Sequence, residues 1–427
     1  MYTAIPSEKQ LEWHEMEFGV IIHYCAEIYN PDFKEYKTKA VRTELDPHTF
    51  NPKSLNPEQW VRSAYEAGAK YAVLVCNHCT GFSLWQTKVN DYSCASMNWK
   101  NGKGDIFREF IDACKKYGLK PGAYYSTGCN GYYNINDEWK HDYRAPYYRE
   151  YIKNVEAQVK ELWSEYGELV EIWFDGGIIP VEDGGPDIVP ILEKYQPDAI
   201  TFQGPKGYKN SVRWVGNEDG YATDDCWGST NSGYRGYLDE TLDNEKWHGN
   251  PDGHFYCPAE TDVPNRTHEA FGGGWGWREN EEDTVVPVDK LMDMYIHSVG
   301  RNTNLLLGMA ISVDGDFQDE QQFIDFGKKL KETFGTPVTT IKNPVFTDNK
   351  TSFKATGNGK FIVIREDITS GQRIRDFTVY VNDMPICKAG SIGHKRIISQ
   401  PVADGDEITF AVNLSDGKFE LRDIEIY

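Results

Sequence analysis

"ELVEIWFDGG", residues 168–177, is the stretch from which the fold can be worked out. Leu169, Val170 and residues 172–174 form a nearly continuous apolar run, which is typical of a strand buried on both faces of a parallel sheet. Asp175 ends this run, and the two glycines that follow allow the chain to turn sharply and approach another group closely. The stretch therefore predicts a buried strand with a carboxylate at its carboxyl end.

The same alternation of apolar strand and helix pattern runs through the first three quarters of the chain. Seven further strands are expected at 18–24, 70–76, 121–126, 199–204, 212–217, 254–260 and 302–308. Amphipathic helix patterns lie between them, and the clearest are at 56–68, 105–118, 147–167 and 287–300. Eight strands that alternate with helices predict a (β/α)8 barrel of the TIM type, whose chemistry lies at the carboxyl ends of the strands.

From about residue 338 the pattern changes to short alternating strands and turns, without a long helix pattern. Segments such as "KFIVIRE", "FTVYVND" and "EITFAVN" predict a small β-sandwich. We therefore predict a catalytic barrel over residues 1–337 and a C-terminal β-sandwich over residues 338–427. Since none of the sandwich strands singles out a ligand site, we expect this domain to support the barrel rather than bind carbohydrate.

The composition excludes several kinds of partner. With 66 acidic and 45 basic side chains, the formal net charge is -21, so nucleic acid and anionic membranes should be repelled. The N-terminal segment lacks the cationic start and apolar core of a signal peptide, which predicts a cytoplasmic location. Nine cysteines at irregular spacing predict buried free thiols rather than a disulfide framework. The 14% aromatic content permits a site that stacks sugars.

Polar side chains stand where the predicted barrel strands end. They are His23, His78, Tyr124, Tyr125, Asp175, Glu218 and Glu260. Because barrel geometry gathers these ends, we expect one polar pocket. Two carboxylates beside histidines and aromatic rings suit glycoside hydrolysis, with Asp175 as nucleophile and Glu218 as acid and base. A carboxyl separation of ~5 to 5.5 Å would retain the anomeric configuration, and one of ~6.5 to 9.5 Å would invert it.

An ordered set of motifs resembles glycoside hydrolase family 29, the α-L-fucosidases, and in particular the branch that favours α-1,3 and α-1,4 linkages. The motifs are "MEFGVIIHY", "KYAVLVCNHCTGFSLWQTKVNDYS", "KPGAYYS", "IWFDGG", "RWVGNEDG" and "SVGRNTNLLLG". The resemblance implies a retaining exo-α-L-fucosidase that acts on oligosaccharides or glycoconjugates without a metal or organic cofactor. It also implies that Asp175 is the nucleophile, that Glu218 is the acid and base, and that His23, His78, Tyr125 and Trp173 line the pocket.

The chain departs from the family pattern near two of these residues. Where the family has "KHHDGF" this chain has "NHCTGF", which places Cys79 at a histidine position, and where the family has "IHFGxN" it has "IHYCAE", which places Cys25 at a glycine and Glu27 at an asparagine. A thiol is a weaker donor than imidazole. We therefore keep L-galactosides and L-glucosides as alternative substrates, and we expect Glu27 and Cys79 to contact the sugar.

Other interpretations accompany these predictions. Asp175 could be a turn residue that caps the next helix, and Asp219 or Glu260 could replace Glu218 as the acid and base; Glu260 is otherwise expected to bind substrate. Trp275 and Trp277 lie in a glycine-rich rim loop and could stack on sugar, and Trp277 is taken as a binding residue. The whole chain could also be a sugar-binding protein on an inactive hydrolase scaffold.

The sequence "CNHC", residues 76–79, raises the question of a zinc site, because thiolate and imidazole are zinc ligands. Cys76, His78 and His23 could converge. However, no paired CxxC or HxxxH motif occurs, and Cys76 fits a buried strand position. We therefore predict no metal.

Overall fold

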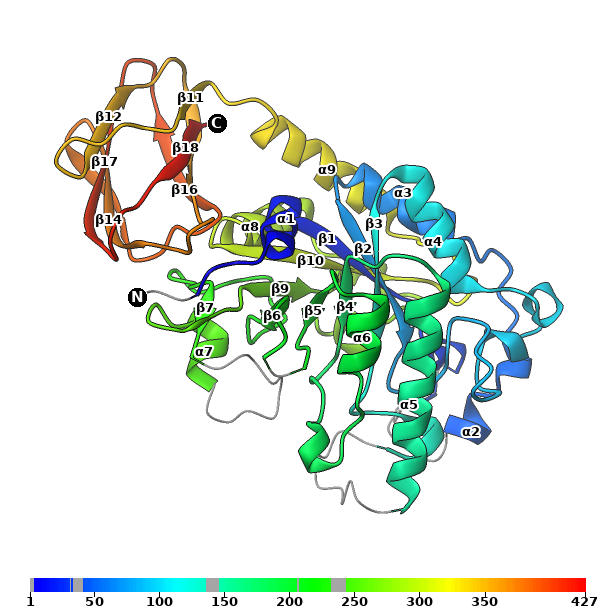
Figure 1. The fold of residues 1–427 in the computed structure, drawn as a ribbon. Helices are drawn as coiled ribbons and strands as arrows, with labels where there is room; N and C mark the ends of the chain where they lie inside the picture. The colour runs from blue at the N-terminus through cyan, green and yellow to red at the C-terminus, as the bar shows by residue number, and fades with distance from the viewer. Residues whose placement is uncertain (1–3, 31, 34–40, 136–145, 206, 232–242) are drawn as a thin grey trace.

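The computed structural model describes residues 4–427 except 31, 34–40, 136–145, 206 and 232–242. Eight parallel strands close into a barrel, in the order β1-β10-β9-β6-β5-β4-β3-β2 (Figure 1). Their bounds are β1 (Phe18–His23), β2 (Tyr71–Asn77), β3 (Lys120–Tyr125), β4 (Glu171–Trp173), β5 (Ile200–Phe202), β6 (Ser211–Trp214), β9 (Ala259–Val263) and β10 (Thr303–Ala310). The predicted (β/α)8-like barrel is confirmed.

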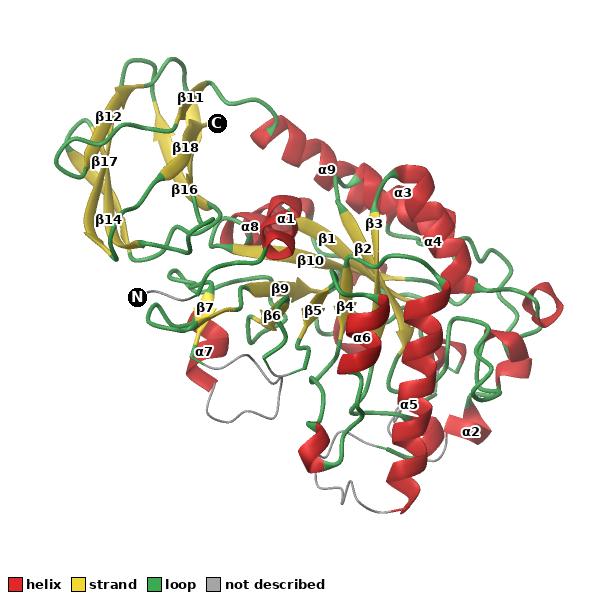
Figure 2. Ribbon diagram, viewed as in Figure 1, coloured by secondary structure: helices red, strands yellow, loops and turns green. Residues whose placement is uncertain are grey.

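Most of the longer helices lie around the outer face of the barrel (Figure 2). The described helices are α1 (Glu8–Met16), α2 (Val41–Glu44), α3 (Pro57–Glu66), α4 (Ile106–Tyr117), α5 (Pro146–Glu165), α6 (Val189–Tyr195), α7 (Asp243–His248), α8 (Val288–Ser298) and α9 (Glu320–Phe334). Within the described residues, no helix has both the length and the apolar composition needed to cross a membrane.

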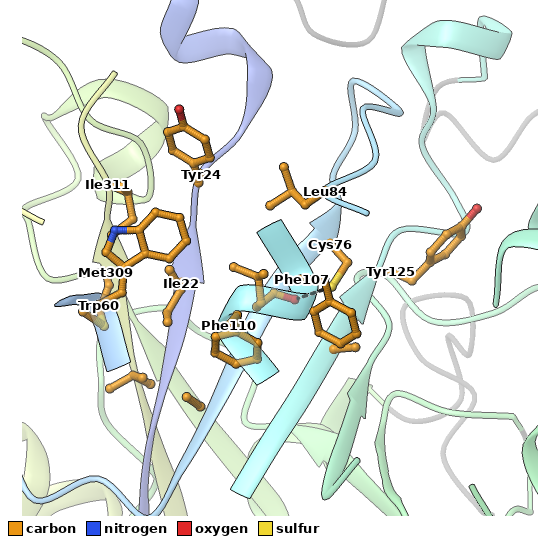
Figure 3. Packing of buried hydrophobic residues seen from close by; sticks show 14 of the residues in the cluster. Ile22, Tyr24, Trp60, Cys76, Leu84, Phe107, Phe110, Tyr125, Met309 and Ile311 are labelled. Carbon is orange, nitrogen blue, oxygen red and sulfur yellow. Dashed lines mark hydrogen bonds between the residues drawn. The ribbon is translucent and has the colours of Figure 1, made fainter. Parts of the chain in front are cut away.

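Helix α4 shows how the local sequence sets these elements. Asp105 caps its start by accepting a hydrogen bond from the backbone N–H of Arg108 at 2.8 Å, and Gly118 ends it in the left-handed region at φ 75°. Phe107 and Phe110 are fully buried against the barrel (Figure 3). The periodic apolar face of the helix therefore supplies part of the layer between the barrel and its helices.

The barrel separates two apolar layers. Residues that point inward, such as Val73, Tyr124 and Phe202, fill the barrel interior. Residues that point outward pack against the helices, and Cys76 and Tyr125 belong to this outer layer (Figure 3). Because side chains alternate between the two faces of a strand, neighbours in sequence enter different layers.

The seventh barrel strand differs from the prediction. Residues 254–260 were expected to form it, but Phe255–Tyr256 forms β8, which pairs with β7 (Ser229–Thr230) outside the barrel. The barrel strand β9 starts only at Ala259. The reason is Pro258, which lies between the two segments and has no backbone N–H to donate to a neighbouring strand, so β8 and β9 pair with different partners.

The C-terminal β-sandwich is confirmed. One sheet has the order β11 (Thr339–Lys342), β18 (Leu421–Ile426), β13 (Gly359–Glu366) and β16 (Arg396–Val402), and the other has β12 (Lys350–Lys354), β17 (Glu407–Ser415), β14 (Ile374–Val381) and β15 (Met384–Ala389). The two sheets enclose their own apolar core, which includes Ile362, Phe377 and Phe410. Helix α9 of the barrel ends at Phe334, five residues before β11 begins.

Buried polar groups join the sandwich to the barrel at the amino ends of the barrel strands. Glu17, just before β1, forms an ion pair with Lys395 and accepts a hydrogen bond from the Tyr295 hydroxyl at 2.9 Å. Asn302, just before β10, accepts a hydrogen bond from the backbone N–H of His394 at 2.7 Å. These contacts lie at the end of the barrel opposite to the carboxyl ends of the strands, which is consistent with a supporting role.

Candidate active site

A cavity of about 240 Å³ lies at the carboxyl ends of the barrel strands. It is lined by acidic, imidazole, thiol and aromatic side chains from several strands and loops: His23, Cys25, Glu27, His78, Tyr124, Trp173, Asp175, Glu218, Asp262, Phe271 and Trp275, together with Ile21, Ile28, Gly272 and Gly276. The cavity therefore brings together six of the predicted site residues. They are the two catalytic candidates, Asp175 and Glu218, and the predicted binding residues His23, Glu27, His78 and Trp173.

Asp175 lines this cavity two residues after the end of β4. Gly176 and Gly177 adopt φ values of 69° and 82°, in the left-handed region, so the chain turns away and leaves the carboxylate facing the open cavity. The Tyr124 hydroxyl donates a hydrogen bond to Oδ2 of Asp175 at 2.9 Å. The Tyr124 ring stacks on Trp173 with ring centres 5.3 Å apart, so the carboxylate is held by a packed aromatic wall.

Glu218 lies in the turn after β6 and lines the cavity. Asn217 accepts a hydrogen bond from the backbone N–H of Asp219 at 3.0 Å, which fixes this turn locally. The indole N–H of Trp275 donates to Oε2 of Glu218 at 3.0 Å, and the Trp275 ring lies 5.0 Å from that of His23. Glu218 is solvent-exposed, so it stands at the mouth of the cavity.

The two histidines lie at the ends of neighbouring strands. Their ring centres are 6.2 Å apart with an interplanar angle of 79°. Burial, together with the neighbouring His78, lowers the pKa of His23 to about 3, so His23 is neutral at pH 7. His78 lies against Glu27, whose Oε1 is 3.3 Å from His78 Nδ1.

Two thiols flank His78. Cys25 lines the cavity, and burial raises its pKa to about 11. Cys79 lies behind the cavity lining, with its sulfur within 4.8 Å of donor atoms of both His78 and Asp175, and a hydrogen bond with Cys129 together with burial raises its pKa. The positions at which the sequence departs from the family pattern thus converge around one imidazole.

Tyr125 lies outside the cavity, which corrects the predicted pocket role. Its ring is fully buried in the layer behind β3 (Figure 3). Its hydroxyl donates a hydrogen bond to Oε1 of Gln158 on α5 at 2.7 Å. Tyr124, one residue earlier, points inward instead. Because side chains alternate along β3, only one of the two adjacent tyrosines can face the cavity, and that residue is Tyr124.

Glu260 also lies outside the cavity lining. It is fully buried in the barrel interior, where Oε1 accepts a hydrogen bond from the Trp173 indole at 3.0 Å and Oε2 accepts one from the Tyr71 hydroxyl at 2.9 Å. Burial raises its pKa to about 7. Because β9 starts at Ala259, Glu260 lies at the beginning of its strand and not at the end. It therefore binds the Trp173 indole from the side of the barrel interior, beneath the cavity.

Asp262, two residues further along β9, lines the cavity and was missed by the sequence prediction. It accepts a hydrogen bond from the Trp214 indole at 2.7 Å. Burial and the charge of Glu218 raise its pKa well above the usual range. Residues two apart on a strand face the same side, so Asp262 faces the barrel interior as Glu260 does, one step nearer the carboxyl end. A correct prediction of where β9 starts would therefore have identified Asp262 as a cavity residue.

Of the two tryptophans in the rim loop, Trp275 faces the cavity. A Cβ atom at Gly308 of β10 would lie 2.8 Å from its ring, so the glycine allows the ring to lie close to the strand. Trp277, the predicted binding residue, lies outside the lining and donates its indole hydrogen to Oε1 of Gln318 at 3.2 Å. No sequence signal distinguishes the two rings.

Comparison with known proteins places this arrangement in a family. The chain is 30% identical to Alpha-L-fucosidase 1 of Arabidopsis thaliana over 355 residues, which covers 81% of this chain and 62% of that protein. It is 24% identical to the tissue alpha-L-fucosidase of Rattus norvegicus, covering 71% of this chain and 57% of that protein. The chain therefore spans 62% and 57% of the lengths of these two relatives.

Solved structures share the architecture. A Bacteroides thetaiotaomicron VPI-5482 protein, provisionally described as an α-L-fucosidase, has a TM-score of 0.89 and 31% identity, with 100% of this chain and 99% of that chain covered. A glycoside hydrolase 29 family member from an unknown rumen bacterium has a TM-score of 0.82 and 26% identity, with 100% and 77% covered. Residues 2–331 match the family model of α-L-fucosidase. The chain therefore belongs to the α-L-fucosidase family, glycoside hydrolase family 29.

Proposed function

We propose that this chain is a retaining exo-glycosidase that hydrolyses terminal α-L-fucosyl residues of oligosaccharides or glycoconjugates. The observation that carries the proposal is that Asp175 and Glu218, which come from different strand ends, line the same aromatic cavity. The names of the Arabidopsis and rat relatives support the same substrate class. Such a pair of carboxyl groups meets the minimum requirement of glycoside hydrolysis.

Asp175 acts as the nucleophile in this proposal. Its carboxylate attacks the anomeric carbon and forms a glycosyl ester, while the leaving oxygen takes a proton from the acid. The hydrogen bond from Tyr124 fixes one carboxylate oxygen, so the other is presented to the sugar. A short side chain on a strand end suits this role because little conformational freedom is lost on attack.

Glu218 acts as the acid and base. It stands at the cavity mouth, through which the leaving group must depart, and the Trp275 indole orients it. Asp262 is nearly fully buried and already bonded to Trp214, which leaves it a supporting position beside Glu218. Glu260 lies below the cavity, and Asp219 faces His268 with Oδ1 3.3 Å from Nε2, so neither replaces Glu218.

The test is hydrolysis of an aryl α-L-fucoside by the parent, Asp175→Gly and Glu218→Ala, with and without azide. We expect turnover by the parent and losses of several orders of magnitude in both variants. In a retaining enzyme, azide should rescue Asp175→Gly with inversion to the β-azide and Glu218→Ala with retention as the α-azide. Asp219→Ala and Asp262→Asn are the controls for the acid and base.

Two results would contradict the proposal. Rescue of Asp262→Asn but not of Glu218→Ala would move the acid and base to Asp262. Binding of L-fucose by a parent that shows no hydrolysis would indicate a sugar-binding protein on this scaffold.

A second substrate is favoured by one observation. Oε2 of Glu27 is buried at the cavity wall, and it has no hydrogen-bond partner among the residues that the structure describes. L-Galactose carries a hydroxyl at C6 where L-fucose has a methyl group, and such a hydroxyl could donate to a free carboxylate oxygen. The aryl α-L-galactoside and α-L-glucoside therefore belong in the same assay, with Glu27→Gln as the variant. Faster hydrolysis of the galactoside that is lost in Glu27→Gln would establish this alternative.

A further inference from the structure

The donor atoms of three cavity side chains lie close enough together to bind a metal ion. The sulfur of Cys25, a carboxylate oxygen of Glu27 and an imidazole nitrogen of His78 all lie within 4.8 Å of one another. The separation of 3.3 Å between Glu27 Oε1 and His78 Nδ1 is about that of two ligands placed ~2 Å from one Zn²⁺ at the tetrahedral angle.

A second observation points to a ligand at the same place. Among the described residues, Oε2 of Glu27 has no hydrogen-bond partner although it is buried. A buried carboxylate oxygen of this kind requires compensation, which a bound cation would supply. Glu27 is 7% exposed and Cys25 is 8% exposed, so both side chains already occupy a mostly dry wall of the cavity.

The three ligand residues lie on or next to regular secondary structure. Cys25 lies two residues after the end of β1, and Glu27 lies in the 3-10 helix Ala26–Tyr29. His78 directly follows β2, the strand that pairs with β1. Since all three line the cavity, a fourth coordination position would open toward it. Three protein ligands with one open position is the pattern of a zinc site that is accessible to small molecules.

We propose that Cys25, Glu27 and His78 form a binding site for a thiophilic divalent cation, of which Zn²⁺ is the type. On binding, the Cys25 thiol and the protonated imidazole of His78, whose pKa is raised, each release one proton to water. A sulfur–metal and a nitrogen–metal bond form in their place, and no group changes its oxidation state. The ion occupies the wall at which the sugar is proposed to bind, so Zn²⁺ inhibits hydrolysis. This consequence for activity rests on the proposed function, whereas the binding itself does not.

A neighbouring set of donors competes for the ion. His78, Cys79 and Asp175 also have donor atoms within 4.8 Å of one another. This set shares His78 with the first, so one imidazole serves one or the other. The Cys79 thiol is engaged with Cys129 and lies behind the cavity lining, and Asp175 is exposed, which favours the first set.

The test uses Co²⁺ as a spectroscopic probe, because a cobalt–thiolate bond has a charge-transfer absorption that water and carboxylate ligands do not produce. We expect one Co²⁺ per chain in the parent, with this band, and displacement by Zn²⁺. Cys25→Ser should remove the band, and Glu27→Gln should weaken binding by at least about 10-fold, the lower end for loss of even an outer partner of a metal site. Cys387→Ser, which removes a half-buried thiol on β15 of the sandwich, is the matched control and should bind as the parent does.

The possible results separate cleanly. A parent without a saturable cobalt–thiolate band overturns the proposal, as does a band that survives in Cys25→Ser. A band lost in Cys79→Ser but kept in Cys25→Ser would assign the ion to the other set and also overturns it. If Cys25→Ser fails to fold, the affinity of Glu27→Gln decides, and unchanged affinity there contradicts the site. Because the readout is absorption, the outcome is independent of whether the chain hydrolyses fucosides.

Discussion

The buried carboxyl groups beneath the cavity should make the stability of the barrel depend on pH. Glu260 is fully buried, and burial raises its pKa from an ordinary value of about 4.5 to about 7. Glu171 lies in the same interior, and burial with the charge of Glu260 raises its pKa as well. Both carboxyl groups are neutral in the folded chain at a pH where the unfolded chain has ionised them.

The sign of the effect follows from proton linkage. Between about pH 4.5 and pH 7 the folded state binds more protons than the unfolded state, so the free energy of unfolding falls as the pH rises. Each pH unit in this window contributes ~1.4 kcal/mol for one group, which gives about 3 kcal/mol for Glu260 across the window. The contribution is fully present below pH 4.5 and is lost by about pH 7.

The perturbation is Glu260→Gln, which keeps the shape and leaves an oxygen to accept the hydrogen bond from Trp173. The expected result is that the variant gains stability relative to the parent by about 3 kcal/mol between pH 4.5 and pH 7. The assay is urea unfolding followed by tryptophan fluorescence, which reports on the barrel alone because all 12 tryptophans precede residue 338.

A control separates the titration from the hydrogen bond. Tyr71→Phe removes the donor to Oε2 of Glu260 but leaves the carboxyl group. It should lower stability by about 1 to 3 kcal/mol. The fall of stability with rising pH should remain, and it should extend to higher pH because the hydrogen bond from Tyr71 lowers the pKa of Glu260. If the difference between Glu260→Gln and the parent stayed constant from pH 4.5 to pH 7, the reasoning about a buried neutral carboxyl group would be refuted.

Three further predictions test the site and the domain contact. Tyr124→Phe removes the hydrogen bond to the Asp175 carboxylate and should lower kcat/KM on the aryl fucoside by about 10- to 100-fold, measured by initial rates; an unchanged rate would remove Tyr124 from the positioning of the nucleophile. Gly177→Ala places a residue with a Cβ at φ 82° and should destabilise the barrel by about 1 to 2 kcal/mol in urea unfolding. An unchanged stability would show that the turn does not need a glycine at this position. Although burial opposes it, the charge of Lys395 holds the pKa of Glu17 well below its usual range, so this ion pair stabilises the chain above about pH 4.5 and loses its effect as the pH falls. Glu17→Gln should therefore cost about 3 to 5 kcal/mol at pH 7 and progressively less in acid, by the same unfolding assay, and an equal cost at both pH values would contradict the ion pair.

The sequence alone was sufficient to predict the architecture and the position of Asp175 after a buried strand. Apart from Glu171, the run Leu169–Phe174 is apolar on both faces, which is the pattern of a strand inside a layered parallel sheet, so the strand and the carboxylate that follows it could be predicted locally. The helices 105–118 and 147–167 were equally predictable because caps and the 3.6-residue period are local properties. The sandwich followed from the change to a two-residue period.

The lining of the cavity was not predictable in the same way, because it depends on where each strand starts. One residue along β3 exchanges Tyr124 for Tyr125, and two residues along β9 exchange the barrel-filling Glu260 for the cavity residue Asp262. Pro258 decides the second case, although an apolar run on both sides of it reads as one strand. A shift of one residue along a strand moves a side chain to the other face, and the amino-acid composition does not determine that shift.

The grouping of Cys25, Glu27 and His78 was decided only by the tertiary structure. The sequence pattern drew attention to Cys76, which instead faces the outer layer and donates its thiol hydrogen to the carbonyl oxygen of Leu74 at 3.3 Å. Cys25 and His78 lie more than fifty residues apart, and the pairing of β1 with β2 brings them together. Sequence determined which side chains could bind a ligand, whereas the register of neighbouring strands determined which of them meet, because that register is set by packing across the whole barrel.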